Sequence, residues 1–283
     1  PDAFAEPPAW LEGAAERVAE LAALGVPVAQ DDDGLRLRQL PGMQRPCAAF
    51  VEAQTGHVVA RALDRQVTAL GVTRLEHFLP WELVVRDDRC AGIVVADRRD
   101  GKLVELSGRV VLAGGGLGVL DANSIAATPV ESLIAVALRA GVVLRQPAAR
   151  QPQPTTLWRG GRPLPLSDAL RAEGARLWVP KERGDERAPA DIPGKDRRQL
   201  GELTRDDAEL ADTIAALASK EAGVGDDADE IYVDLTHLPR SRLVGPIGSE
   251  LAAIEAVVGT SPQAAALPVA ALSLGSLAGL CAA

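Results

Sequence analysis

The segment from Arg109 to Gly118 constrains the fold more than any other part of the chain. It opens with the continuous apolar run Val110 to Ala113, which is typical of a strand covered on both faces. Three glycines follow at once, and a backbone without a Cβ can turn sharply and lie against a ligand or another backbone. The carboxyl end of such a strand is where open α/β sheets bind cofactors. A buried strand with a tight turn and no ligand fits the segment equally well, so both interpretations stay open at this point.

Composition limits the partners that the protein can have. The chain of 283 residues is long enough for one large or two ordinary domains. Aromatic residues make up 3%, so we expect a core built mainly from Ala, Val, Leu and Ile. The net charge of −9 argues against nucleic acid, whose phosphates are bound by clustered Lys and Arg. No apolar run reaches the ~20 residues of a membrane span, so we also expect no direct membrane insertion.

The three cysteines, Cys47, Cys90 and Cys281, show no paired spacing. The sequence therefore predicts neither a disulfide framework nor a metal site, and it favours a reducing, cytosol-like compartment. The chain starts at Pro1 and carries no charged-then-apolar signal segment. We expect it to be a fragment, a processed product or part of a longer protein.

Hydrophobic periodicity and capping residues predict the main elements. Helices are expected over 7–25, 55–71, 129–141, 168–174, 206–221 and 250–258. Short apolar runs separated by charged turns predict a three-stranded meander over 81–106 and a further strand over 231–235. The prolines and glutamines of 146–156 predict an irregular crossing between domains, and the charged stretch 181–198 predicts an exposed loop.

Eight short segments, none of them specific alone, follow one another in an order that is typical of one family. They are Leu24–Pro27, Arg45–Ala49 with Thr55–His57, Asp87–Ile93, Val110–Gly118, Ala137–Gly141, Arg171–Gly174 and Tyr232–Leu238. In their shared order and spacing, the chain resembles the flavoprotein subunit of succinate dehydrogenase and fumarate reductase, and the related L-aspartate oxidases. The resemblance runs from about residue 10 to about residue 272, with Gly114 in place of the usual Thr.

The resemblance implies an α/β fold in which residues 1–143 form an FAD-binding, Rossmann-like domain with a β-meander. Residues 144–262 would form an α+β capping domain over a dicarboxylate, and 263–283 would return toward the FAD-type domain. The implied cofactor is FAD, with Ala113, Gly114, Gly115 and Gly116 beside it. The family's Gly-x-Gly-x-x-Gly strand, which holds the FAD pyrophosphate, is not among these residues, so we expect this stretch alone to bind FAD weakly.

The implied reaction is hydride transfer between a succinate- or fumarate-type dicarboxylate and the flavin. The family's catalytic arginine falls on Arg205, for which a solvated charge at a helix start is the alternative. Its substrate-binding Thr-Glu pair falls on Ser167 and Asp168, and its substrate-binding histidine falls on Gln153. Glutamine still donates a hydrogen bond but carries no positive charge. The family's second histidine falls near Leu274, which can do neither.

The resemblance also implies an iron-sulfur or other redox subunit as partner, and a cytoplasmic location or membrane association through partner subunits. Two other interpretations remain. Gln153, Leu274 and the absent phosphate loop favour a catalytically inactive family member that acts as a structural or assembly subunit. An unrelated α/β protein is the third, against which the ordered family segments argue.

Overall fold

The computed structural model describes residues 12–40, 43–52, 55–115, 131–145, 150–159, 162–200, 207–244, 247–259, 262, 266–276 and 279–281. The chain forms two compact units, each assembled from three separate stretches. The first unit comprises Pro1–Thr73, Ser167–Arg176 and Asp234–Ala266, and the second comprises Arg74–Leu166, Leu177–Val233 and Leu267–Ala283. The domain division at residues 143 and 262 stays a prediction.

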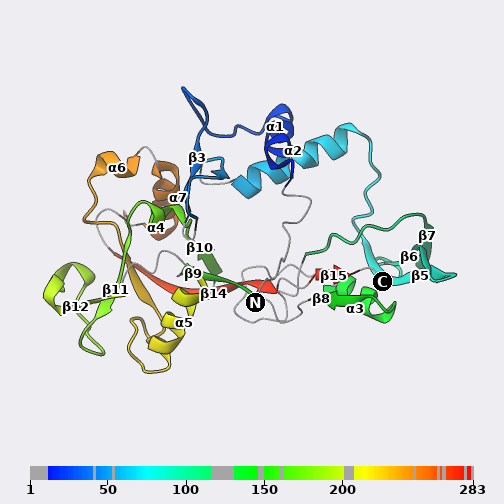
Figure 1. Ribbon diagram of the computed structural model, residues 1–283. Coiled ribbons are helices and arrows are strands. Elements are labelled where there is room, and N and C mark those ends of the chain that lie inside the picture. The colour runs from blue at the N-terminus through cyan, green and yellow to red at the C-terminus, as the bar shows by residue number, and fades with distance from the viewer. Residues whose placement is uncertain are drawn as a thin grey trace. The chain divides into compact units, whose positions relative to one another are not determined.

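The first unit is mainly helical (Figure 1). Its helices are α1 (Ala14–Ala23), α2 (Thr55–Ala69), α4 (Ala169–Ala172), α6 (Arg240–Val244) and α7 (Gly248–Val258). Two short antiparallel pairs join them, β1 (Gln30–Asp31) with β2 (Gly34–Leu35) and β3 (Leu37–Arg38) with β4 (Ala48–Ala49). Aliphatic side chains from three stretches pack between α1 and α2. They are Val26, Val51 and Ala62, with Leu21, Val28, Val58 and Val59 around them.

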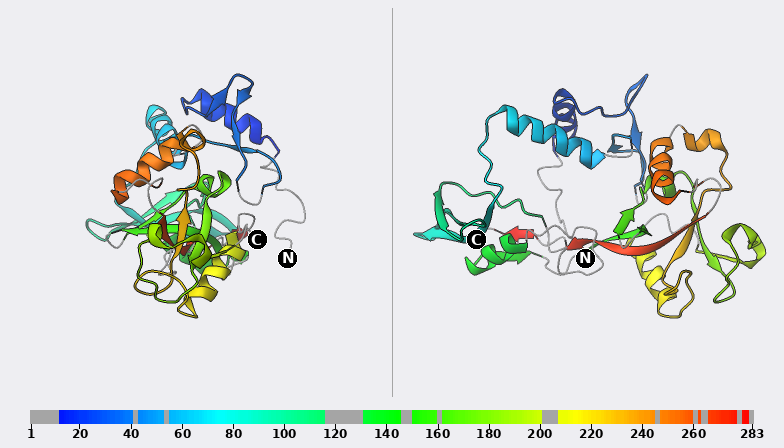
Figure 2. Two further views of the ribbon diagram at one scale, coloured as in Figure 1. Left: turned by 90° about the vertical axis from the view of Figure 1, so that its left-hand side faces the viewer. Right: turned by 180° about the vertical axis from the view of Figure 1, so that it is seen from behind.

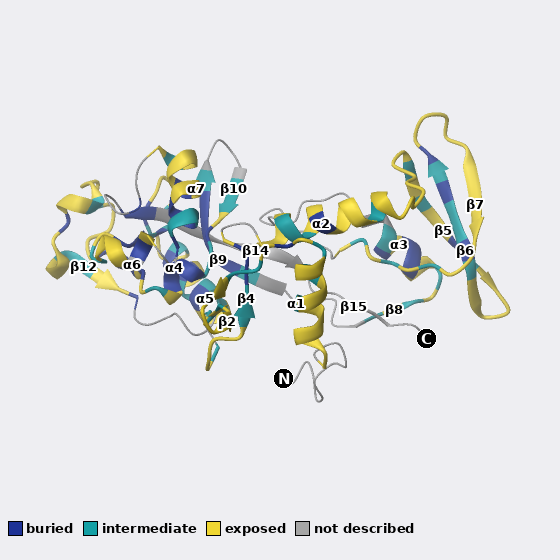
Figure 3. Cartoon of the chain, turned by 90° about the horizontal axis from the view of Figure 1, so that it is seen from above, coloured by how far each residue is buried: buried dark blue, intermediate teal, exposed yellow. Residues whose placement is uncertain are grey.

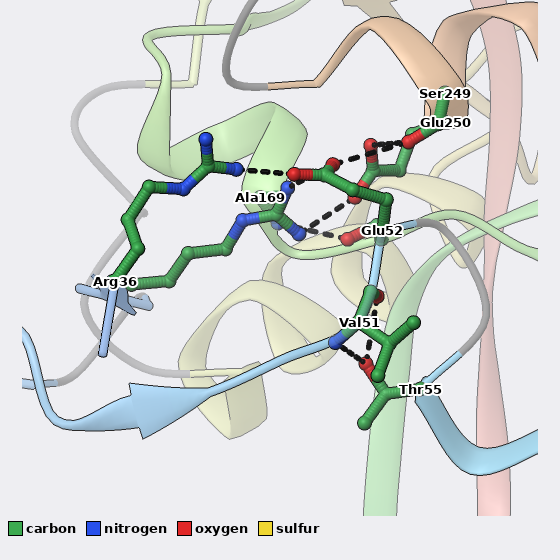
Figure 4. A network of polar contacts seen from close by, with 9 residues as sticks. Arg36, Val51, Glu52, Thr55, Ala169, Ser249 and Glu250 are labelled. Carbon is green, nitrogen blue, oxygen red and sulfur yellow. Dashed lines mark hydrogen bonds and ion pairs between the residues drawn. The ribbon is translucent and has the colours of Figure 1, made fainter. Parts of the chain in front are cut away.

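A polar network ties strand β3 to helix α7 across 212 residues of sequence (Figure 4). Arg38 Nη1 donates to Glu250 Oε1 at 2.6 Å, and the Arg38 guanidinium lies 3.8 Å from the centre of the Phe50 ring. Glu52 accepts from Arg38 at 3.3 Å and from Ser249 at 3.2 Å. Because Glu250 is buried, its charge requires such a partner, and the network fixes how β3 lies on α7.

The second unit contains a six-stranded sheet in the order β10-β9-β14-β13-β11-β12. The strands are β9 (Arg150–Arg159), β10 (Arg162–Pro165), β11 (Arg176–Pro180), β12 (Arg197–Gln199), β13 (Ile231–Asp234) and β14 (Leu267–Ser276), the long red strand of Figure 2. Helix α5 (Asp207–Ala218) contacts β9 and β14. It buries Leu210, Ile214 and Leu217, which lie on one helical face and supply its share of the core.

A three-stranded meander and a small pair complete the second unit. The meander is β5 (Phe78–Arg86), β6 (Arg89–Asp97) and β7 (Leu103–Ser107), and helix α3 (Glu131–Arg139) contacts β5. Strands β8 (Val143–Arg145) and β15 (Gly279–Cys281) pair antiparallel. Every residue of β7 is exposed (Figure 3). The predicted meander is confirmed, with strands longer than the sequence indicated.

The buried side chains are mostly aliphatic, as the composition predicts, and Trp178 is the main exception in the second unit. Its ring is fully buried, with Tyr232 at 4.6 Å between ring centroids and the Arg197 guanidinium 4.3 Å from the ring centre. Within the described residues, no helix combines the length and hydrophobicity that crossing a membrane requires.

Two predictions about backbone structure are wrong. Val110 to Ala113 is not a strand, and Val111 is 86% exposed. An apolar run becomes a strand only if a neighbour supplies hydrogen bonds, and no strand of the described residues pairs with this segment. Conversely, the expected irregular crossing over 146–156 contains much of β9, which pairs on both sides. Pro152 and Pro154 fit there because the β9–β14 register is irregular around them.

Thr156 generates a prediction about stability. Its hydroxyl oxygen is buried in β9 and has no hydrogen-bond partner among the described residues. Because a buried hydroxyl without a partner is destabilising, we expect Thr156→Val to raise the free energy of unfolding by about 1 kcal/mol, measured by urea denaturation. Thr155→Val is the matched control and should not stabilise, since the Thr155 hydroxyl has a partner in Gln153. Equal effects of both substitutions would contradict this account.

Candidate functional site

The short helix α4 buries an arginine. Ala169, Leu170 and Arg171 are all buried, and the Arg171 side chain is 1% exposed. Its Nη2 donates to Asp168 Oδ1 at 2.6 Å. A guanidinium cannot lose its proton at physiological pH, so its burial requires a carboxylate or equivalent acceptors nearby. The buried Arg171 guanidinium therefore compensates the negative charge of Asp168, which is itself partly exposed.

Ser167 precedes this ion pair and is held by the backbone. Its Oγ accepts the N–H of Ala169 at 3.2 Å. A serine hydroxyl has one hydrogen to donate besides the bonds that it accepts, and no acceptor for that hydrogen is found in the described part of the chain. Ser167 is partly exposed, so this hydrogen is available to a ligand. The structure brings together Ser167 and Asp168, and it adds Arg171, to which the sequence analysis assigned no role.

The loop after β13 supports the end of α4. His237 forms a hydrogen bond with the backbone of Gly174, which lies two residues after the end of α4 and has a φ of +104°. Burial lowers the pKa of His237 below its usual value, the nearby Arg176 charge adds to this, and Asp234 opposes it. Asp234 accepts from the backbone N–H and the hydroxyl of Thr236 at 2.9 Å and 2.6 Å. Both residues belong to the segment Tyr232–Leu238, to whose histidine the sequence alone gave no function.

Gln153 lies in β9 and is buried. Its Nε2 donates to the carbonyl oxygen of Leu166 at 3.1 Å, and it is 3.5 Å from Thr155 Oγ1. Leu166 immediately precedes Ser167 in the chain. The Gln153 amide nitrogen thus forms its hydrogen bonds within the second unit.

The segment predicted to lie beside FAD is open. Ala113, Gly114 and Gly115 have no regular secondary structure, and Gly116 lies outside the described residues. Gly115 has a φ of +83°, and no atom of the described residues lies within 4 Å of the place where its Cβ would be. Val111, just before them, is exposed. Uncharged residues such as Ala113, Gly114 and Gly115 suit contact with the flat rings of FAD, and their place beside FAD stays a prediction.

The predicted roles of two further residues, Arg205 and Leu274, are not tested by the contacts of the described residues. Arg205, the predicted catalytic arginine, lies outside the described residues. Leu274 lies in the part of β14 that runs along β9. The assignment of both stays a prediction.

His237 generates a prediction about pH. Because its pKa is lowered in the folded state, the unfolded chain takes up the proton first. Its contribution to stability is therefore fully present above about pH 6.5 and is lost as the pH falls toward the folded-state pKa. We expect His237→Gln to flatten this decline in urea midpoints measured between about pH 7 and pH 5. Substitution of His57, exposed in α2, is the matched control. A decline that persists unchanged in His237→Gln would refute the assignment.

Comparison with known proteins adds independent evidence. A family model described as an FAD binding domain matches residues 8–281. The succinate dehydrogenase flavoprotein subunit of Bacillus subtilis is 26% identical over 278 residues, covering 91% of this chain and 45% of the relative. The L-aspartate oxidase of Xylella fastidiosa is 38% identical over 155 residues, covering 54% of this chain and 28% of the relative. The chain spans less than half the length of these relatives.

Solved structures share the fold. A quinol fumarate reductase of E. coli superposes with a TM-score of 0.76 at 23% identity, covering 96% of this chain and 47% of that one. A Mycobacterium smegmatis Sdh1 complex superposes with a TM-score of 0.64 at 22% identity, covering 95% of this chain and 45% of that one. The fold is that of an FAD-binding flavoprotein with mixed helices and strands. The chain therefore belongs to the FAD binding domain family, with the flavoprotein subunits of succinate dehydrogenase and fumarate reductase and the L-aspartate oxidases, and its cofactor is FAD.

Proposed function

We propose that the protein is an FAD-dependent oxidoreductase that acts on a small dicarboxylate of the succinate or fumarate type. Family membership supports the cofactor and the reaction class. The observation that carries the choice of substrate is the buried Arg171–Asp168 ion pair directly after Ser167. These are the positions at which the family resemblance expects a hydroxyl and a carboxylate that bind substrate.

The charges around Ser167 suit a carboxylate ligand. An uncompensated Asp168 would repel an anion, but Arg171 at 2.6 Å neutralises it. The Ser167 hydroxyl can then donate to a substrate carboxylate while its oxygen is held by Ala169. Because the Ser167 oxygen is already held in place, binding a substrate carboxylate would cost little further conformational entropy of the Ser167 side chain.

FAD, when bound, supplies the hydride acceptor or donor through its N5 atom. In this chain Ala113, Gly114 and Gly115 would lie along its rings. Arg205 stays our proposal for the residue that gives or takes the substrate proton, as the resemblance implies. Such a role requires it to reach the carbon skeleton while the carboxylates are held elsewhere.

We further propose that electrons pass to a partner redox subunit, such as an iron-sulfur protein, and that any membrane association occurs through partners. The M. smegmatis neighbour is a subunit of a complex, which supports a partner in general.

A test of this function combines spectroscopy with turnover. The complete protein, purified with FAD supplied, should show flavin absorbance that is bleached anaerobically by succinate and restored by fumarate. Arg205→Ala should slow this reduction by at least about 100-fold, because proton transfer by a positioned group contributes 10²–10⁴-fold.

Arg198→Ala, at an exposed position in β12, is the matched control and should reduce as fast as the wild type. Flavin absorbance that no dicarboxylate can bleach would contradict the proposed substrate and favour an inactive subunit. Reduction at an unchanged rate in Arg205→Ala would remove this residue from the mechanism.

A further inference from the structure

We propose that Gln153 is a positioning residue that holds the peptide group leading into Ser167, and that it does not touch the substrate. The substrate part of this inference rests on the proposed function, whereas the positioning part rests on the contacts of Gln153 itself. This role, in which Gln153 acts on the substrate only through the position of Ser167, differs from the direct substrate contact that the family resemblance implies for Gln153.

The contacts of Gln153 all point away from a ligand role. The residue is 7% exposed, and its Nε2 donates to the Leu166 carbonyl at 3.1 Å and to Thr155 Oγ1 at 3.5 Å. The Leu166 N–H in turn donates to the Thr155 carbonyl at 2.9 Å. Both backbone polar groups of Leu166 are therefore held by β9, one by its backbone and one by the Gln153 side chain.

The place of Leu166 at the end of the β9–β10 ladder explains why a side chain supplies this donor. The paired strand β10 ends at Pro165, so Leu166 is the first residue beyond the ladder. A buried carbonyl there needs a donor, and a glutamine amide can give one without bringing a charge into the interior.

The hydrogen bond from Gln153 affects the candidate site through the peptide bond between Leu166 and Ser167. The Leu166 carbonyl belongs to the peptide group that it shares with Ser167, so fixing that carbonyl fixes the plane from which Ser167 departs. Asp168 follows at once and is anchored on its other side by Arg171. The Ser167–Asp168 pair is thus held at both ends, by Gln153 before it and by Arg171 after it.

Amide hydrogen exchange tests the positioning directly and needs no ligand. Gln153→Met keeps the length of the side chain but removes the amide, and Thr156→Val is the matched control in the same strand. We expect Gln153→Met to increase exchange at least about fivefold in peptides covering 166–174, with no increase in the control. Gln153→Glu, which sets a carboxylate against the carbonyl, is the second variant and should show the same increase. Unchanged exchange in both Gln153 variants would overturn the inference.

A double-mutant cycle then separates positioning from direct contact. Succinate affinity, measured by calorimetry on the FAD-loaded protein, should fall roughly tenfold in Gln153→Met, and should fall no further when Gln153→Met is added to a Ser167→Ala, Asp168→Asn background. Independent, additive losses would overturn the inference, because they mean that Gln153 reaches the ligand itself. Absence of succinate binding in the wild type would instead contradict the proposed function, and the exchange result would still decide whether Gln153 positions Ser167.

Discussion

The buried guanidinium of Arg171 is the constraint around which the candidate site is arranged. It cannot shed its charge, so the chain must place a carboxylate beside it, and Asp168 does so from three residues earlier. Breaking a buried pair by removing one partner typically costs about 3–5 kcal/mol, so the register of α4 is strongly fixed. A neutral His237 at the end of α4 fits the same logic, because Arg176 already disfavours a further positive charge there.

Local signals predicted much of the fold. The meander from β5 to β7 was found because charged turns at Asp87–Asp88 and Arg98–Gly101 separate short apolar runs. Helices α2, α5 and α7 were also predicted from a local signal, the spacing of apolar residues within each helix. The two errors concern segments whose structure depends on partners far away in sequence. Val110–Ala113 looks like a strand but has no strand beside it in the described residues, whereas β9 looks irregular but is paired on both sides.

The candidate site was only partly predictable. Ser167 and Asp168 came from a family resemblance, and the structure places them beside Arg171, whose burial no local pattern indicates. A short helix that contains Arg and Glu is expected to expose these side chains to solvent, and only the tertiary packing shows that Arg171 is buried. Gln153 was assigned to the substrate by alignment, yet its contacts lead to Leu166. The assignment of Gln153 to the substrate stays a prediction.

The central claim is that the Ser167–Arg171 segment binds one carboxylate of a small dicarboxylate in an FAD-dependent enzyme. A crystal structure of the complete protein with FAD and succinate tests it most directly. We predict one succinate carboxylate within hydrogen-bonding distance of Ser167 Oγ, roughly 2.7 Å, with the Asp168–Arg171 ion pair intact beside it. Succinate bound elsewhere, with Ser167 facing only solvent, would contradict the account.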